Sequence, residues 1–219
     1  MYEGPVVDRM ARDHPSLVPA ALGKYIREGL RLGAVNGPFP SVAAVRAHLR
    51  GLGLGDRLHR NPRGCVPKPG ADPPWRIIDD KSAGFLEAVN AWISLSGLET
   101  VQMDGLNVVT RLIQRARAKY GPGATLMAFK VDIESAFRRL VLRMADWWLG
   151  LMSIDSDARD GVLYYLDVAC SFGMRSSVFW FGVFSLAIRR CGQDLGAFWA
   201  VYVDDILGIE EASRAQASL

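Results

Sequence analysis

The chain has 219 residues, of which 50% are apolar and 22% charged, with 22 Gly, 11 Pro, three Cys and a formal net charge of +3. This composition is typical of an ordinary globular protein, and it excludes a disordered chain, a collagen-like repeat and a disulfide scaffold. Residues 1–150 carry 21 Lys and Arg against 14 Asp and Glu, whereas residues 151–219 carry 5 against 9; this suits a protein that holds a polyanion and a divalent metal, but ordinary solvated surfaces look the same.

The first 60 residues predict a helical extension. Apolar residues at helical spacing indicate one helix over about 17–33 and a second that begins after Pro40, with Ser41 as its N-cap. The segment 61–85 is rich in Pro, Gly and charge, and it predicts an exposed loop or hairpin that contains a strand at 76–78.

The middle of the chain predicts a helix followed by a strand. The helix covers 104–120, is capped by Asp104 and ends at Gly121. The strand covers 125–131 and ends on Asp132, so that a carboxylate follows directly after a β-type apolar run.

The last third predicts two hairpins separated by a helix. Strands at 147–154 and 162–168 flank an Asp-rich turn, and a strongly apolar helix covers 176–191. Within 198–209, two short apolar runs are separated by Asp204 and Asp205, which predicts a β-hairpin with both carboxylates at its tip.

These carboxylates are the candidate chemical group of the sequence. If the strand that ends on Asp132 neighbours the hairpin 72 residues later, three carboxylates meet at one rim of a sheet. Such a group can hold two Mg²⁺ ions about 4 Å apart, one activating an attacking oxygen and the other stabilising the leaving oxygen of a phosphoryl transfer. Each piece alone is explained as well by ordinary turn and capping chemistry.

Four segments in order resemble a reverse transcriptase, and together they are far more specific than any one of them. Residues 75–82 resemble the fingers segment, 130–137 the first palm motif and 172–177 the second palm motif, and residues 202–205 (YVDD) match the Y-x-D-D box. The details of the match are closest to DIRS-like retrotransposons. The resemblance implies an α+β fold with fingers and palm, an antiparallel palm sheet backed by helices, and a domain division into 1–60 and 61–219.

The resemblance also implies an activity and a role for each matched residue. The activity is RNA-directed DNA polymerisation, in which two Mg²⁺ ions (Mn²⁺ being an alternative) support transfer of dNTPs onto a primer paired with an RNA or DNA template. The implied roles are metal binding and catalysis for Asp132, Asp204 and Asp205; triphosphate binding for Lys68 and Arg76; exclusion of a ribose 2′-hydroxyl for Phe137; nucleotide contact for Phe172 and Gly173; and primer or template contact for Tyr202 and Arg175.

The sequence also departs from the family. Proline is usual where Val178 and Met144 stand, and a Leu-Pro pair is common at Cys170-Ser171; these changes alter the backbone but remove no catalytic group. The sequence stops 14 residues after Asp205, without the thumb, an RNase H domain or the later palm segments. We therefore expect weak activity from this chain alone, self-association through unfinished palm surface, and missing C-terminal domains in a longer parent protein.

Two other functions remain open. A catalytically inactive remnant of a retroelement would at most bind nucleic acid through its basic half, and metal binding separates it from an enzyme. A palm-type RNA polymerase is disfavoured by Phe137, because a polar partner for the 2′-hydroxyl is expected there. A zinc site built from His14, His48, His59 and Cys65 matches no common ligand spacing.

The sequence also bears on location. The longest apolar run without a charge lies between Arg175 and Arg189 and is shorter than the roughly 20 residues of a bilayer span. The N-terminus lacks the basic and apolar segments of a signal peptide. The three cysteines are widely spaced and form no CxxC pair, which fits a reducing compartment. We therefore expect an intracellular protein without a membrane contact.

Overall fold

The structure is a computed structural model, and it describes residues 17–61, 63–82, 86, 88–94, 96, 100–156 and 161–217. These residues form two compact units, one from the described parts of Met1–Ser94 with Phe137–Ser177 and one from those of Leu95–Ala136 with Val178–Leu219. The predicted division at residue 60 remains a prediction. Within the described part of the chain, no helix is both long and apolar enough to cross a membrane.

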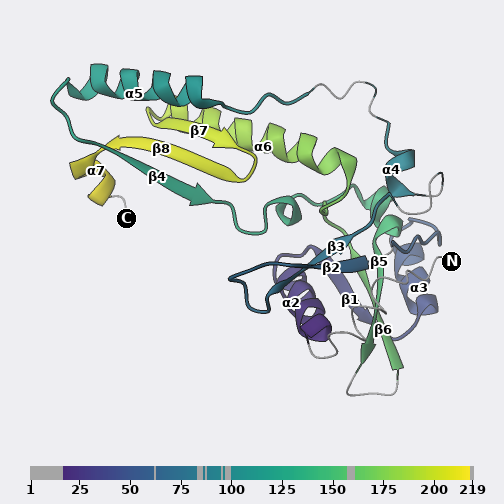
Figure 1. Cartoon of the computed structure of the whole chain (residues 1–219). Helices are drawn as coiled ribbons and strands as arrows, with labels where there is room; N and C mark the ends of the chain where they lie inside the picture. Colours follow the sequence, from purple (N-terminus) through teal and green to yellow (C-terminus); the bar gives the residue numbers. More distant parts are fainter. Residues whose placement is uncertain are drawn as a thin grey trace. The chain divides into compact units, whose positions relative to one another are not determined.

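The first unit contains a three-stranded sheet, a two-stranded hairpin and short helices (Figure 1). Its sheet has the order β1-β6-β5 with antiparallel pairs, and its hairpin pairs β2 with β3. The elements in chain order are α2 (Leu17–Arg31), β1 (Val35–Phe39), α3 (Val42–Gly51), β2 (Arg63–Pro67), β3 (Trp75–Asp79), α4 (Val89–Trp92), β5 (Leu151–Ser156) and β6 (Gly161–Asp167).

Local sequence explains several of these elements. Ser41 caps α3 as predicted, because its Oγ accepts a hydrogen bond from Ala44 N at 3.1 Å. The predicted 61–85 hairpin is confirmed over its described residues. Its alternation places Cys65 and Ile77 in a small core with Ala21 of α2, while the other face of the hairpin stays exposed.

Two expectations for the first unit were wrong. Residues 144–150 form a 3₁₀ helix and the strand begins only at Leu151, because the apolar side chains of this helix, including Trp147 and Trp148, pack on Val45 and Leu49. The sequence also did not predict β1, which interrupts its apolar run with Gly and Pro and is held by pairing with β6.

A network of buried charges lies beneath the hairpin of the first unit. Arg63 Nε donates to Asp79 Oδ1 at 2.6 Å, and Lys81 Nζ lies 3.6 Å from Asp79 Oδ2. Burial alone would raise the pKa of Asp79, but Arg63 and Lys81 outweigh it, and the pKa lies below its ordinary value. The Tyr25 hydroxyl donates to Asp167, whose pKa is raised mainly by burial.

The second unit is a three-stranded antiparallel sheet with helices on it. The strand order is β4-β8-β7, and β8 is therefore central. The elements in chain order are α5 (Leu106–Tyr120), β4 (Leu126–Asp132), α6 (Arg175–Asp194, from Val178 onward in this unit), β7 (Phe198–Tyr202), β8 (Asp205–Glu211) and α7 (Ala212–Ala217).

Helices α5 and α6 contact side chains that alternate along β7. Phe198 and Ala200 pack with Leu112 and Ala116 of α5 in one core. Trp199 points to the other side of the strand, where its ring lies against Gly192 of α6 so closely that a Cβ there would come within 2.1 Å of it. The helices α5 and α6 run along the sheet in Figure 1.

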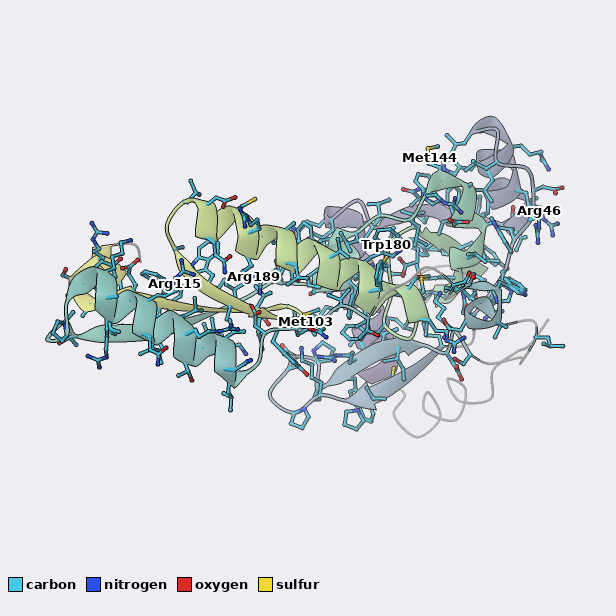
Figure 2. The ribbon with its side chains drawn as sticks, turned by 90° about the horizontal axis from the view of Figure 1, so that it is seen from above. Arg46, Met103, Arg115, Met144, Trp180 and Arg189 are labelled. Atoms are coloured by element: carbon cyan, nitrogen blue, oxygen red, sulfur yellow. The ribbon has the colours of Figure 1, made fainter. Side chains whose placement is uncertain are left out.

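The predicted cap of α5 was wrong. The N-cap position is Gly105 without a side-chain bond, whereas the buried carboxylate of Asp104 accepts a hydrogen bond from Val201 N at 3.0 Å and pairs with Arg189 of α6. Arg189 and Met103, both labelled in Figure 2, lie along this contact, and Met103 packs at Gly182 of α6. A tertiary ion pair thus replaces a local cap.

Candidate nucleotidyl-transfer site

The three predicted carboxylates lie together at one end of the second unit's sheet. Asp132 is the last residue of β4 and Asp205 the first of β8, and the two are directly paired in the antiparallel register. Asp204 occupies the adjoining turn, where its carbonyl oxygen accepts a hydrogen bond from Ile133 N at 2.9 Å. The predicted hairpin with carboxylates at its tip, next to the strand that ends on Asp132, is therefore present.

Directly paired residues share a face of an antiparallel sheet, and like charges in this position repel. The sheet brings Asp132 and Asp205 into such a pair, and Tyr202, which is also opposite Asp205, is 64% exposed on the same face. This register therefore leaves an excess of negative charge at the sheet end, which favours a bound cation.

Lys130 supplies one cation to this group, and the sequence assigned it no role. It lies two residues before Asp132 on the same face of β4, and its Nζ is 2.9 Å from Asp205 Oδ1. Its pKa is raised first by the hydrogen bond to Asp205 and further by the charges of Asp205, Asp132 and Asp204. Within the described residues, no three His, Cys, Asp or Glu side chains are placed to share a metal ion; His14 lies outside them.

The turn that carries Asp204 is held in an unusual conformation. Val203 has φ 55°, which is rare for a β-branched residue and costs on the order of 1–3 kcal/mol. The fully buried Ser185 Oγ on α6 lies within hydrogen-bond distance of the Val203 carbonyl oxygen. A lone polar residue in an apolar helix was the only sequence signal for this contact.

We expect Ser185→Ala to lower the free energy of unfolding by about 1–2 kcal/mol, because the Val203 carbonyl then loses its donor. Denaturant unfolding measures the change. Ser213→Ala, at an exposed serine in the same unit, should change it by less than about 0.5 kcal/mol. Equal effects of the two substitutions would contradict this role of Ser185.

The predicted triphosphate-binding residues lie on the exposed face of the first unit's hairpin. Arg76 on β3 pairs with Val66 on β2, and Lys68 follows two residues after Val66, so the strand alternation places all three on one side. Arg76 and Lys68 are both exposed. A guanidinium and an ammonium on one exposed face suit paired phosphate oxygens.

Arg76 also begins a stack of side chains that includes two other predicted residues. Its guanidinium carbon lies 5.1 Å from the ring centroid of Phe172, which in turn meets the buried Phe137 edge to face at 4.8 Å. Phe172 remains 47% exposed. Residues far apart in the sequence are thus brought together, with an aromatic surface left open beside a cation.

Gly173 and Arg175 continue from this stack. Gly173 has φ +90°, and a Cβ on it would lie 2.5 Å from the Asp79 carbonyl oxygen at the end of β3, so only glycine fits. Arg175 is exposed at the start of α6. The predicted site residues therefore form two groups, one in each unit.

No family model matches this sequence, and no curated protein matches it. The chain is similar to solved structures of foamy virus protease-reverse transcriptases. Two are complexes with double-stranded DNA (16% and 15% identity, TM-scores 0.56 and 0.55, each covering 90% of this chain but 27% and 32% of the other). A third is a selenomethionine-labelled mutant from prototype foamy virus (16% identity, TM-score 0.57, covering 94% of this chain and 21% of the other).

The chain thus spans about a fifth to a third of the length of these proteins. At this identity the similarity is one of fold. It confirms the mixed α and β, reverse-transcriptase-like fold that the four motifs predicted. The DIRS-like type remains a prediction.

Proposed function

We propose that this chain is the fingers and palm part of an RNA-directed DNA polymerase from a retroelement, and that it transfers dNTPs onto a primer paired with an RNA or DNA template. The observation that carries this proposal is the register that pairs Asp132 with Asp205 and sets Asp204 in the adjoining turn. The similar fold of viral reverse transcriptases supports it.

In this proposal Asp132, Asp204 and Asp205 hold two Mg²⁺ ions, or Mn²⁺. Carboxylate oxygens are the ligands that these ions prefer, and the paired like charges fit a cation. The ions supply charge neutralisation for the reacting phosphate when bound. Lys130 leaves Asp205 when the carboxylate takes up an ion, because the exposed ion pair contributes little by itself.

The other residues bind and select the nucleotide and the primer-template. Lys68 and Arg76 neutralise the β- and γ-phosphates, and Phe172 with Gly173 lies beside the nascent base pair. Phe137 occupies the space that a ribose 2′-hydroxyl needs. Tyr202 contacts the primer end, and Arg175 contacts the template.

Primer extension tests this function directly. Purified chain is given a labelled DNA primer on an RNA template with one dNTP and Mg²⁺ or Mn²⁺, and addition of one nucleotide is the expected result. Absence of both addition and metal binding would instead favour the inactive remnant, for which the Lys130 contact to Asp205 already provides a metal-free resting state.

We expect Phe137→Val to lower the preference for dNTP over NTP by roughly 10- to 100-fold, because the smaller side chain admits the 2′-hydroxyl. Competition between dTTP and UTP in the same assay measures the ratio. Phe137→Tyr keeps the ring and should keep the preference. An unchanged ratio in a folded Phe137→Val variant would show that this ring does not select the sugar.

A further inference from the structure

Asn90 is a buried polar residue that the sequence did not single out. It lies on the short helix α4 and is 7% exposed. Its Nδ2 donates to the Gly173 carbonyl oxygen at 2.7 Å and to Ser82 Oγ at 2.9 Å, and its Oδ1 accepts from Arg175 N at 2.9 Å. One side chain therefore bonds to the chain just after β3 and to the segment that leads into α6.

The orientation of this amide is unambiguous. The Arg175 backbone N–H can only donate, so the oxygen of the Asn90 side chain must face it. Both N–H groups of the amide then point at acceptors. The Asn90 backbone N–H also donates to the Lys81 carbonyl oxygen at 2.9 Å, so the main chain of Asn90 is anchored as well.

These bonds hold the backbone of residues 172–175 from two sides. The Arg175 N–H is one of the first amides of α6, which have no partner within the helix, and Asn90 acts as a cap supplied from 85 residues away. Gly173 is pressed against the Asp79 carbonyl oxygen and is held there by its bond to Asn90. The half-exposed ring of Phe172 is carried by this fixed backbone.

We propose that Asn90 is a positioning residue for the incoming nucleotide: it fixes the backbone of residues 172–175 and thereby the place of Phe172 and Arg175. The proposal rests on the function proposed above. Asn90 touches no substrate in this proposal and acts only through the segment that it holds. Misplacement of a binding group by about 1 Å costs on the order of 100-fold, so the loss of two such bonds has a measurable effect on nucleotide affinity.

The test measures binding of dTTP to the chain loaded with a dideoxy-terminated DNA primer on an RNA template, and separately the binding of Mn²⁺. Asn90→Ala is compared with Asn61→Ala, because Asn61 Nδ2 also donates to a distant carbonyl oxygen, that of Leu149, at 2.7 Å. Asn90→Asp keeps the volume and the acceptor for Arg175 N–H, but its carboxylate cannot donate to Gly173.

We expect Asn90→Ala and Asn90→Asp to weaken dTTP binding by roughly tenfold or more while Mn²⁺ binding stays within about twofold of wild type. Asn61→Ala should leave both unchanged at a similar loss of stability. Equal dTTP affinities for Asn90→Ala and Asn61→Ala would overturn the positioning role and leave the proposed function intact. A wild-type chain that binds neither dTTP nor Mn²⁺ would overturn both.

Discussion

Asp204→Asn is expected to lower nucleotide incorporation by about 1,000-fold or more, because a ligand that neutralises the reacting phosphates through its metal supplies several kcal/mol, and each 1.36 kcal/mol is a factor of ten. Binding of Mn²⁺, followed through the spectrum of the free ion, should weaken by about tenfold or more. The carboxylate lies in the turn beside the paired Asp132 and Asp205, so its loss removes charge from this group.

Stability separates this effect from misfolding. Asp132 and Asp205 face each other across the sheet as like charges, and removal of one neighbouring charge should leave the free energy of unfolding unchanged or raise it slightly. Asp194→Asn makes the same chemical change at an exposed carboxylate of this unit and should alter neither incorporation nor Mn²⁺ binding. Full incorporation by Asp204→Asn would remove the basis of the proposed function.

Arg63→Met is expected to lower the free energy of unfolding at neutral pH by about 3–5 kcal/mol, because it leaves the buried Asp79 without its closest counter-ion. The side chain of Asp79 is 2% exposed and retains only Lys81, at 3.6 Å. Methionine keeps much of the volume, so the loss reports charge more than packing. Denaturant unfolding across pH measures it.

The pH dependence gives this prediction its sign. In the wild type the pKa of Asp79 is below its ordinary value, so the pair stabilises the fold above about pH 4 and this contribution is lost as pH falls through the lowered pKa. Without Arg63, burial raises the pKa of Asp79, and protonation relieves the unpaired charge. The penalty of Arg63→Met should therefore shrink as pH falls from 7 toward 4.

Arg143→Met is the matched control. Arg143 pairs with Asp146 at 2.9 Å, but its side chain is 82% exposed, so its replacement should cost less than about 1 kcal/mol. A similar small and pH-independent cost for Arg63→Met would show that the buried pair does not stabilise this unit. Because Asp79 also contacts Gly173 through its carbonyl oxygen, the pair supports the segment that Asn90 holds.

Features that depend on neighbouring residues were predicted well. Ser41 caps its helix, Gly121 ends α5 with φ 95°, and the apolar alternation located β4 and the hairpin of β7 and β8. Asp104 was predicted as a cap from the same kind of pattern and instead pairs with Arg189, because a partner 85 residues away satisfies a buried carboxylate more completely than the helix end does.

The sequence by itself determined the element types over most of the described chain, the four ordered motifs and the identity of the candidate carboxylates and cations. Helical and strand periods are local properties of the chain, and they can be read without knowing its partners. Only the tertiary structure decided that Asp132 faces Asp205, that Lys130 reaches the same carboxylate and that Asn90 holds Gly173 and Arg175. These contacts depend on strand register and on the packing of segments distant in sequence, because each buried polar group takes whichever partner the completed fold brings within hydrogen-bond distance.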